Sequence, residues 1–195
     1  MLNMRYAAGH KQQTNERILR AAGRLFRQRG YAATGVDAVM ASANLTPGGF
    51  YSHFRSKGDL LAETLDAVFR EAGGEHAKQL SQLKGRSWLQ AFVSFYLSRD
   101  HRDTPDRGCP MAALAVEVAR VGGKTRAVFD KHLHGTIDAV ALQFDAESPD
   151  RERAIAAIAM CLGGLTLARA AGSGDLSEEI LSACRKAAIR EVECR

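Results

Sequence analysis

Cysteine is scarce in this chain, and its spacing argues against both disulfides and a zinc site. The four cysteines, Cys109, Cys161, Cys184 and Cys194, share no C-x-x-C spacing, which favours reduced thiols in a cytoplasm. No apolar segment follows a basic start at the N-terminus, so no signal peptide is visible. We therefore predict a cytoplasmic protein without a bound metal.

Proline is equally rare, with four in 195 residues, and no stretch alternates between apolar and polar residues as a half-buried strand does. Apolar residues make up 46% of the chain, which argues against a disordered protein. Internal repeats and low-complexity segments are absent from the sequence. The predicted fold class is all-α, with about nine helices.

Long apolar runs are also few. The longest uncharged run, residues 154–168, is about 15 residues long, whereas a helix needs roughly 20 to span a bilayer. Arg151, Glu152, Arg153 and Arg169 flank it. This pattern predicts a buried helix and no membrane partner.

The short motifs that carry enzyme chemistry are missing. The chain has no G-x-S-x-G, no glycine-rich phosphate loop and no H-E-x-x-H. His132 and His134 are two residues apart, so they cannot chelate one metal from a regular helix. An enzyme would have to rest on Cys109 alone, and we predict no enzymatic activity and no cofactor.

Positive charge, by contrast, is concentrated at one end. The net charge is +5, and residues 1–57 carry nine Lys and Arg against Glu16 and Asp37, which makes that segment +7 and the remainder −2. A basic head on a near-neutral body indicates a polyanion-binding module with a separate regulatory part. The predicted domains are residues 1–57 and 58–195.

Within the head, residues 34–59 have the pattern of two short helices joined by a tight turn. Thr34 and Asp37 form a predicted capping box, and the first helix should end near Ala43 because Asn44 tolerates a left-handed conformation. Thr46 is the predicted cap of the second helix, with Pro47 at its first position. The stretch is a candidate helix-turn-helix.

The second helix of this pair, predicted to run from Pro47 to about Phe54, has an unusual composition. Gly48 and Gly49 are each worse helix formers than alanine by about 1 kcal/mol, so something other than helix propensity favours them. A glycine lets the backbone press closely against a ligand, and helix N-termini attract phosphate. Phe50 and Phe54 should anchor the helix in the core, which leaves a polar and aromatic outer surface.

These residues resemble the DNA-binding domain of the TetR (tetracycline repressor) family of transcriptional regulators. Residues 43–61, ANLTPGGFYSHFRSKGDLL, carry the resemblance, with Lys57 three residues after the FYSHF block. It covers about residues 14–65. One departure is Asn44, where many relatives have glycine, but asparagine also adopts the left-handed conformation and the turn is not in doubt.

The resemblance implies a dimeric, sequence-specific regulator that binds a palindromic double-stranded DNA operator, and a repressor that a small-molecule effector releases. Residues 1–57 would then be the DNA-binding domain, and residues 58–195 a helical ligand-binding and dimerisation domain. The implied DNA-contacting residues are Thr34, Thr46, Tyr51, His53 and Lys57 on phosphates, and Gly48, Gly49 and Ser52 near base edges, with Pro47 beside them.

Outside the helix-turn-helix, residues 1–11 show no periodicity and are predicted to be an irregular arm. Gly30 should end the first helix, Gly73 and Gly74 should break or kink the fourth, and the polar residues 99–108 should form a loop. Ser148 is the predicted cap of the next-to-last helix. These helices are predicted to begin at about residues 14, 57, 87, 110, 125, 149 and 177.

Apolar stripes on these helices supply a candidate effector pocket and a candidate dimer interface. An aromatic stripe can equally be plain core, and the last two helices can either form a four-helix interface with a second subunit or close the monomer's own core. The pocket candidates are Trp88, Phe92, Tyr96, Cys109, Met111, Phe129 and Leu133. The interface candidates are Ile155, Ile158, Leu162, Gly164, Leu165, Ile180, Leu181, Cys184 and Ala188.

Two alternative functions stay open. Cys109 precedes Pro110 at a predicted helix start, where the helix dipole and the nearby Arg102 and Arg107 favour a thiolate and hence a thiol-based sensor of electrophiles or oxidants. A buried, inert cysteine is the other interpretation. A helical interaction module without DNA binding is the second alternative, but it leaves the +7 head unexplained.

Overall fold

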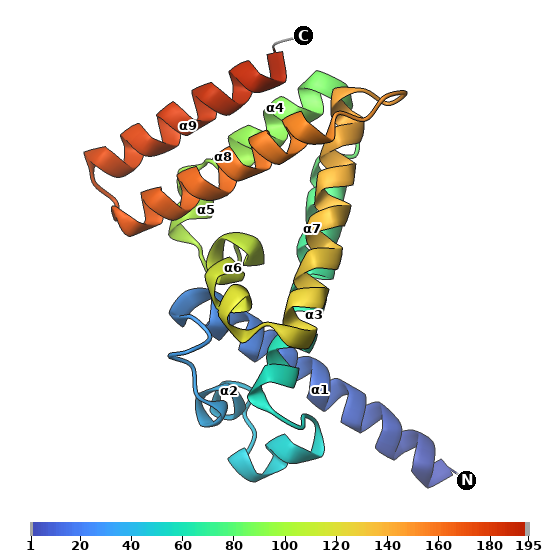
Figure 1. Cartoon of the computed structure of the whole chain (residues 1–195). Coiled ribbons are helices and arrows are strands. Elements are labelled where there is room, and N and C mark those ends of the chain that lie inside the picture. The colour runs from blue at the N-terminus through green and yellow to red at the C-terminus, as the bar shows by residue number, and fades with distance from the viewer. Residues whose placement is uncertain (1, 194–195) are drawn as a thin grey trace.

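The computed structural model describes residues 2–193, with side chains at 10–74 and 78–193. The described chain is built from helices and contains no strand (Figure 1), which confirms the all-α prediction. The elements are α1 (Leu2–Arg29), α2 (Val36–Ser42), the 3₁₀ helix η1 (Pro47–Ser52), α3 (Lys57–Gln79), α4 (Gly85–Tyr96), α5 (Arg99–Asp103), α6 (Pro110–Val121), α7 (Gly123–Phe144), α8 (Arg151–Ala170) and α9 (Asp175–Glu193).

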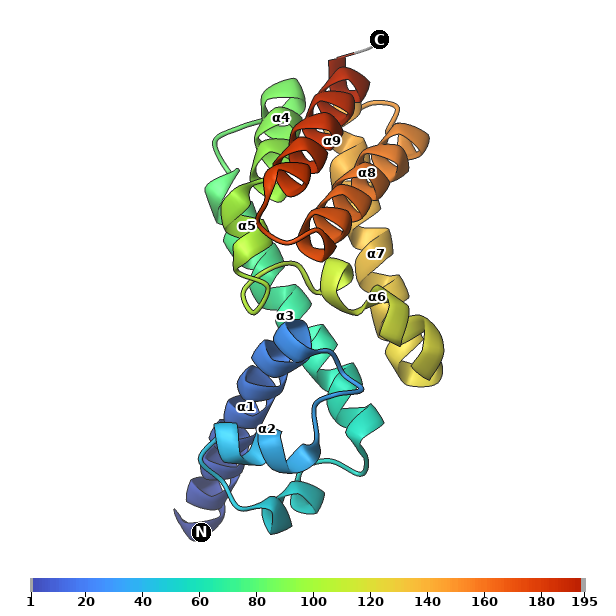
Figure 2. The same ribbon diagram turned by 90° about the vertical axis from the view of Figure 1, so that its left-hand side faces the viewer.

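Two apolar clusters organise the fold. The first joins α1, α2, η1 and α3 to the inner face of α6, and the second lies among α4, α7, α8 and α9. Cys109, Leu133 and Leu162 pack against both clusters. The long helices α3 and α7 pack along each other and connect the α4, α8 and α9 layer to the end that holds α1 and α2 (Figures 1 and 2). The helices α3, α6 and α7 therefore join the two ends of the molecule.

Several helix boundaries differ from the predictions. The irregular arm over residues 1–11 is wrong, because α1 is helical from Leu2. The break at Gly73 and Gly74 is also wrong: α3 continues to Gln79. Each glycine costs a helix only about 1 kcal/mol relative to alanine, and packing of α3 along α7 offsets that cost. The Gly30 stop is confirmed, with φ +84°.

The predicted loop at residues 99–108 contains the short helix α5. Ser98 caps it by accepting a hydrogen bond from the amide of His101, and the buried Arg102 holds it in place. The Arg102 guanidinium donates to Asp103, to the Ser177 hydroxyl and to Glu178. These contacts join α5 to α9, a tertiary arrangement that a run of polar residues does not reveal.

The α8 helix begins two residues later than predicted, since Asp150 rather than Ser148 accepts the capping bond, from the Arg153 amide. By length and composition α8 is the one searched helix that is apolar enough to cross a bilayer. That is weak evidence, because the core helix of a soluble protein passes the same test. Here Ala154, Cys161 and Leu165 of α8 are fully buried in the second cluster.

Candidate nucleic-acid interface and internal cavity

The turn between α2 and η1 has the predicted geometry. Asn44 has φ 54°, the one left-handed non-glycine residue in the described chain, and the Leu45 amide donates to the Met40 carbonyl over 2.9 Å. Leu45 then packs against the first cluster. The helix-turn-helix turn is therefore confirmed.

The predicted capping box at Thr34 is wrong. Gly35 is the N-cap of α2 and no side chain makes a capping bond there. The Thr34 hydroxyl instead donates to the Gly30 carbonyl over 2.7 Å, and the residue is only 1% exposed. Thr34 is therefore buried inside the subunit, away from the outer surface on which the DNA contacts are predicted.

The second helix of the pair is shorter and tighter than predicted. It is the 3₁₀ helix η1, which ends at Ser52, and Thr46 occupies its N-cap position without a side-chain bond. Two glycines in its first turn disfavour a regular α-helix, and short 3₁₀ segments are the common result. Phe50 and Phe54 are buried as predicted, with ring centroids 5.6 Å apart, so they fix η1 to the core.

The outer surface of η1 is open. Tyr51 is 77% exposed, and Thr46, Pro47, Gly48 and Ser52 are also exposed, while Gly49, His53 and Lys57 are half-buried. A Cβ added at Gly48 would meet no atom within 4 Å, so the fold of the subunit does not require glycine there. A glycine that the fold does not need fits a backbone that another molecule approaches closely.

Lys57 and His53 border this surface. The Lys57 ammonium lies 4.2 Å from the centroid of the Tyr31 ring and 3.5 Å from the Ala32 carbonyl oxygen. Burial, and then the charge of Lys11, lower the pKa of His53. Its Nδ1 atom is buried without a hydrogen-bond partner among the described residues. Ser56 caps α3, accepting from the Asp59 amide over 3.0 Å.

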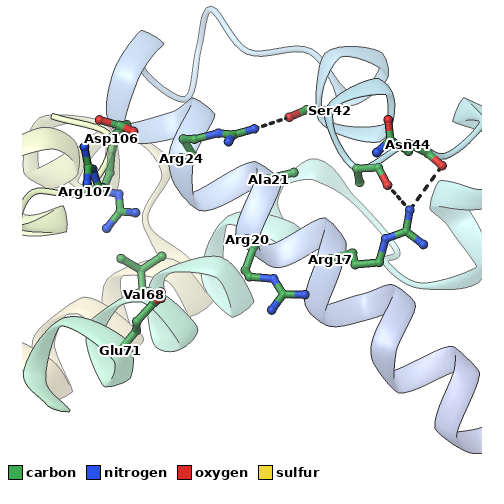
Figure 3. A pocket seen from close by; sticks show the side chains of 12 residues that line it. Arg17, Arg20, Ala21, Arg24, Ser42, Asn44, Val68, Glu71, Asp106 and Arg107 are labelled. Carbon is green, nitrogen blue, oxygen red and sulfur yellow. Dashed lines mark hydrogen bonds between the residues drawn. The ribbon is translucent and has the colours of Figure 1, made fainter. Parts of the chain in front are cut away.

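Part of the positive charge on α1 has a structural role. Arg17 donates to the Ala43 carbonyl over 2.6 Å and Arg24 donates to the Ser42 hydroxyl (Figure 3). Both bonds tie α1 to the end of α2, beside an open groove of about 610 Å³ that Arg20 and Arg107 also line. Arg17 and Arg24 therefore secure the helix-turn-helix as well as contributing to the charge of the head.

A single carboxylate links α6 to the head. Glu117 accepts hydrogen bonds from the backbone amides of Tyr31 and Ala32, both over 2.8 Å. Burial, and then this carboxylate, raise the pKa of Tyr31. Lys57 contacts the same two residues, Tyr31 and Ala32, so Glu117 joins α6 to the loop behind Lys57.

The other end of α6 borders an apolar cavity of about 480 Å³. The predicted residues Trp88, Phe92, Tyr96, Cys109 and Met111 all line it. Its walls come from α3, α4, α6, α7 and α8, and its lining residues belong to both apolar clusters. The cavity therefore lies where the two cores meet.

Two of the predicted pocket residues do not line the cavity. Phe129 packs edge-on against Phe69, with centroids 6.0 Å apart, and Leu133 packs between the clusters. The face of α7 that borders the cavity is mixed in polarity and carries Lys131, His132, Gly135, Thr136, Ala139 and Val140.

The prediction also missed Phe69, Ala72 and Gly73 of α3 and Ile158 and Cys161 of α8. Gly73 and Gly135 lie inside continuous helices at the cavity wall. A Cβ at either position would meet nothing within 4 Å, so the packing of the subunit does not require glycine there.

Cys109 has the predicted place at the N-cap of α6, but its side chain makes no capping bond. Its amide donates to Nε2 of His101 over 3.0 Å, while Nδ1 of His101 lies 2.9 Å from the Tyr96 carbonyl oxygen. An imidazole that accepts at Nε2 carries its proton on Nδ1. Burial raises the pKa of Cys161 to about 12, so that thiol is unreactive. Cys194 lies outside the described residues.

The α8–α9 seam lies mostly inside the subunit. Five of the interface candidates are buried within the subunit: Ile158, Gly164, Leu165, Leu181 and Ala188. These five therefore pack inside one subunit and do not face a second one. A Cβ at Gly164 would lie 2.7 Å from the Cβ of Cys184. Ile155 is 48% exposed, and Leu162, Ile180 and Cys184 are half-buried.

A helix-turn-helix head on a helical body with an internal cavity defines a class of DNA-binding regulators, and comparisons with known proteins identify the family. Residues 18–64 match the family model described as "Bacterial regulatory proteins, tetR family". The uncharacterized HTH-type transcriptional regulator Rv0196 of Mycobacterium tuberculosis is 32% identical over 178 residues, which cover 81% of this chain and 85% of that protein. The chain belongs to the TetR family of bacterial transcriptional regulators.

Solved structures agree on the fold. A TetR regulator from Chloroflexus aurantiacus superposes with a TM-score of 0.81 at 22% identity, covering 95% of this chain and 97% of that one. The reduced form of Escherichia coli NemR superposes with a TM-score of 0.74 at 22% identity, covering 89% of this chain and 96% of that one. The relatives are named as transcriptional regulators, which is consistent with a protein that is not an enzyme.

Proposed function

We propose that this protein is a dimeric, sequence-specific repressor that a small-molecule ligand releases from a palindromic DNA operator. The observation that carries the proposal is the path through α6. Its first turn borders the apolar cavity, and Glu117 near its end holds the Tyr31–Ala32 backbone against which Lys57 rests. A ligand that moves α6 would displace this support. The cytoplasm, where bacterial DNA lies, is the compartment that this function requires.

In this proposal the open surface of η1 contacts DNA. Thr46, Tyr51, His53 and Lys57 bind phosphates, and Gly48, Gly49 and Ser52 approach base edges, with Pro47 beside them. The helix start at Lys57 supports this role, because a cation there is unfavourable unless an anion binds nearby. Residues 1–57 act as the DNA-binding domain and 58–195 as the effector and dimerisation domain, although the apolar core of the head also includes Met111, Leu114 and Val118 of α6.

The second subunit would pack on the outer faces of α8 and α9. Ile155, Ala159, Gly163 and Leu167 are exposed at four-residue spacing along α8, and Leu176 is exposed at the start of α9. An exposed apolar stripe of this kind marks a protein–protein interface, and two helices from each subunit form a four-helix seam.

The test has two stages. DNA fragments that the purified protein retains from a random pool should share a two-fold symmetric sequence, because each half-site is read by one head. Binding of Glu117→Gln to that fragment should weaken about tenfold, since a neutral amide accepts backbone hydrogen bonds less strongly than a carboxylate. The variant Glu147→Gln, at an exposed position in the loop between α7 and α8, is the control and should bind as the parent does. A pool without a shared sequence would contradict the proposal.

A thiol sensor at Cys109 is the second candidate function. Cys109 lines the cavity at the N-terminus of α6, and one structural neighbour is described as the reduced form of NemR, named a transcriptional repressor. Alkylation rates of the individual cysteines, followed against pH by mass spectrometry, test this candidate. If Cys109 titrates near 8.5 like a free cysteine, or if Cys109→Ser loses DNA on oxidation as the parent does, the candidate fails.

A further inference from the structure

We infer that the cavity binds a neutral, flat, aromatic molecule with one oxygen that accepts a hydrogen bond from the Tyr96 hydroxyl. This inference rests on the proposed function, because it names the class of ligand for the same cavity. It follows from the shape of the walls, from one unpaired hydroxyl and from the distribution of charge around the cavity.

The walls favour flat rings. Trp88 and Phe92 of α4 stack with centroids 5.2 Å apart and planes inclined by 9°. Phe69 of α3 and His132 of α7 form a second stacked pair, 4.6 Å apart and inclined by 16°. Both pairs line the cavity, and aromatic groups pack well against such faces in offset or edge-on contact. The volume, about 480 Å³, lies within the roughly 300–1,000 Å³ typical of small-molecule sites.

The Tyr96 hydroxyl is the unpaired polar group. Tyr96 is 5% exposed and lines the cavity, and its hydroxyl is buried without a hydrogen-bond partner among the described residues. Burying a hydroxyl without a partner costs on the order of 1–3 kcal/mol. Burial, and then the charge of the neighbouring Cys109 thiol and a weak contact with it, raise the pKa of Tyr96, so the hydroxyl keeps its proton. Sulfur is a weak acceptor, and the geometry gives the hydroxyl no hydrogen bond to it, so the hydroxyl can donate to a better acceptor. A ligand oxygen would supply the missing acceptor.

The remaining polar groups do not compete for this role. The Thr136 hydroxyl already donates to the His132 carbonyl over 2.9 Å. The Cys109 and Cys161 thiols are weak donors. Arg169 exerts its positive charge on Tyr96 and Cys109 while its guanidinium donates to the carbonyls of His101 and Arg102. A positive charge behind the hydroxyl favours an electron-rich oxygen there over a cationic group.

The charge around the cavity excludes ionic ligands. No acidic side chain is among the described residues that line it, so an organic cation would have no counter-charge. Lys131 is 76% exposed, and its ammonium lies 4.0 Å from Asp66, which also binds His132 over 2.8 Å. An anion bound inside the cavity would therefore not contact the Lys131 ammonium, which lies near the surface beside Asp66. A buried charge without a partner is strongly unfavourable.

Four probes of one shape test the inference by titration calorimetry with the full-length protein: 2-acetylnaphthalene, 2-isopropylnaphthalene, 2-naphthoate and 2-naphthyltrimethylammonium. The ketone should bind about tenfold more tightly than the hydrocarbon, as one hydrogen bond predicts, and both charged probes at least tenfold more weakly than the ketone. Quenching of Trp88, the only tryptophan, should report occupancy of the cavity by the ketone.

Two variants separate the hydroxyl from the cavity itself. Tyr96→Phe should abolish the preference for the ketone and leave the affinity for the hydrocarbon within twofold. Thr136→Val removes a hydroxyl that is already satisfied and should keep the tenfold preference. An unchanged preference in Tyr96→Phe, an equal affinity for a charged probe, or no binding by any probe would each overturn the inference.

Release from DNA is measured separately, on the fragment that the protein selects. If the ketone binds with a Tyr96-dependent preference but the DNA complex survives saturating ketone, the ligand class stands and release by such ligands fails. If the protein binds its DNA fragment but none of the four probes, the ligand class fails while the regulator proposal stands.

Discussion

The two candidate sites of this molecule are assembled in opposite ways. The η1 surface comes from one short segment, residues 44–57, which the sequence displays almost continuously. The cavity comes from α3, α4, α6, α7 and α8, whose lining residues are spread over nearly half of the chain. A contiguous site depends on local turn and helix rules, whereas a dispersed site depends on packing. Substitutions at the two kinds of position should therefore separate binding from stability.

The largest expected effect is on stability, at Gly164. Its hydrogen points at the Cβ of Cys184 and a methyl of Leu97, which a Cβ would approach to 2.7 and 2.9 Å. Gly164→Arg should lower the free energy of unfolding by about 3 kcal/mol or more, through overpacking and a buried charge.

The neighbouring Gly163 is exposed, and a Cβ there would meet nothing within 4 Å. Gly163→Arg should keep the subunit folded and yield monomers by light scattering, and a dimer that survives this change argues against the α8–α9 interface.

The next effect is on DNA binding, at Tyr51. Because its ring is exposed and packs only edge-on to Phe50, Tyr51→Ala should leave thermal unfolding nearly unchanged. We expect weaker binding to all DNA sequences with an unchanged salt slope, because a neutral hydroxyl on a phosphate releases no counterion. Gly48→Leu should block close approach of the backbone to DNA. Fluorescence anisotropy over a range of salt concentrations checks both, and parental binding by both variants would remove η1 as the recognition element.

A smaller effect, again on stability alone, is expected at Thr34. Thr34→Val removes the buried hydrogen bond to the Gly30 carbonyl, which should cost about 1 kcal/mol in urea unfolding. DNA affinity should stay within twofold of the parent. A Thr34→Val protein with normal stability and a lost phosphate contact would return Thr34 to the DNA surface.

The smallest expected effect is the pH dependence at His53. Its pKa is lowered in the folded chain, so below about pH 6.5 the unfolded state binds more protons and stability falls with decreasing pH. Above that value both states are neutral and the effect disappears. His53→Asn should therefore show a shallower loss of stability between pH 6.5 and 5 than the parent. Identical slopes would show that other groups produce the dependence.

The sequence by itself determined the features that depend on near neighbours. The left-handed Asn44, the Gly30 stop, the cap at Ser56 and the anchors Phe50 and Phe54 all follow from short-range rules. Hydrophobic periodicity likewise gave the helical class and placed five pocket residues on the correct helices. These features were predictable because each one involves residues within about one helical turn of one another.

Tertiary structure decided what remained. Whether Thr34 caps a helix or is buried, and whether Gly164 faces a partner or the Cys184 side chain, depends on segments far away in the chain. Apolar periodicity shows that a helix has a buried face but not what covers it, so core, cavity and interface look alike in sequence. The hydrogen bonds of Glu117 to residues 31 and 32 join positions 86 and 85 apart, and only the packing of α6 against the head brings them together.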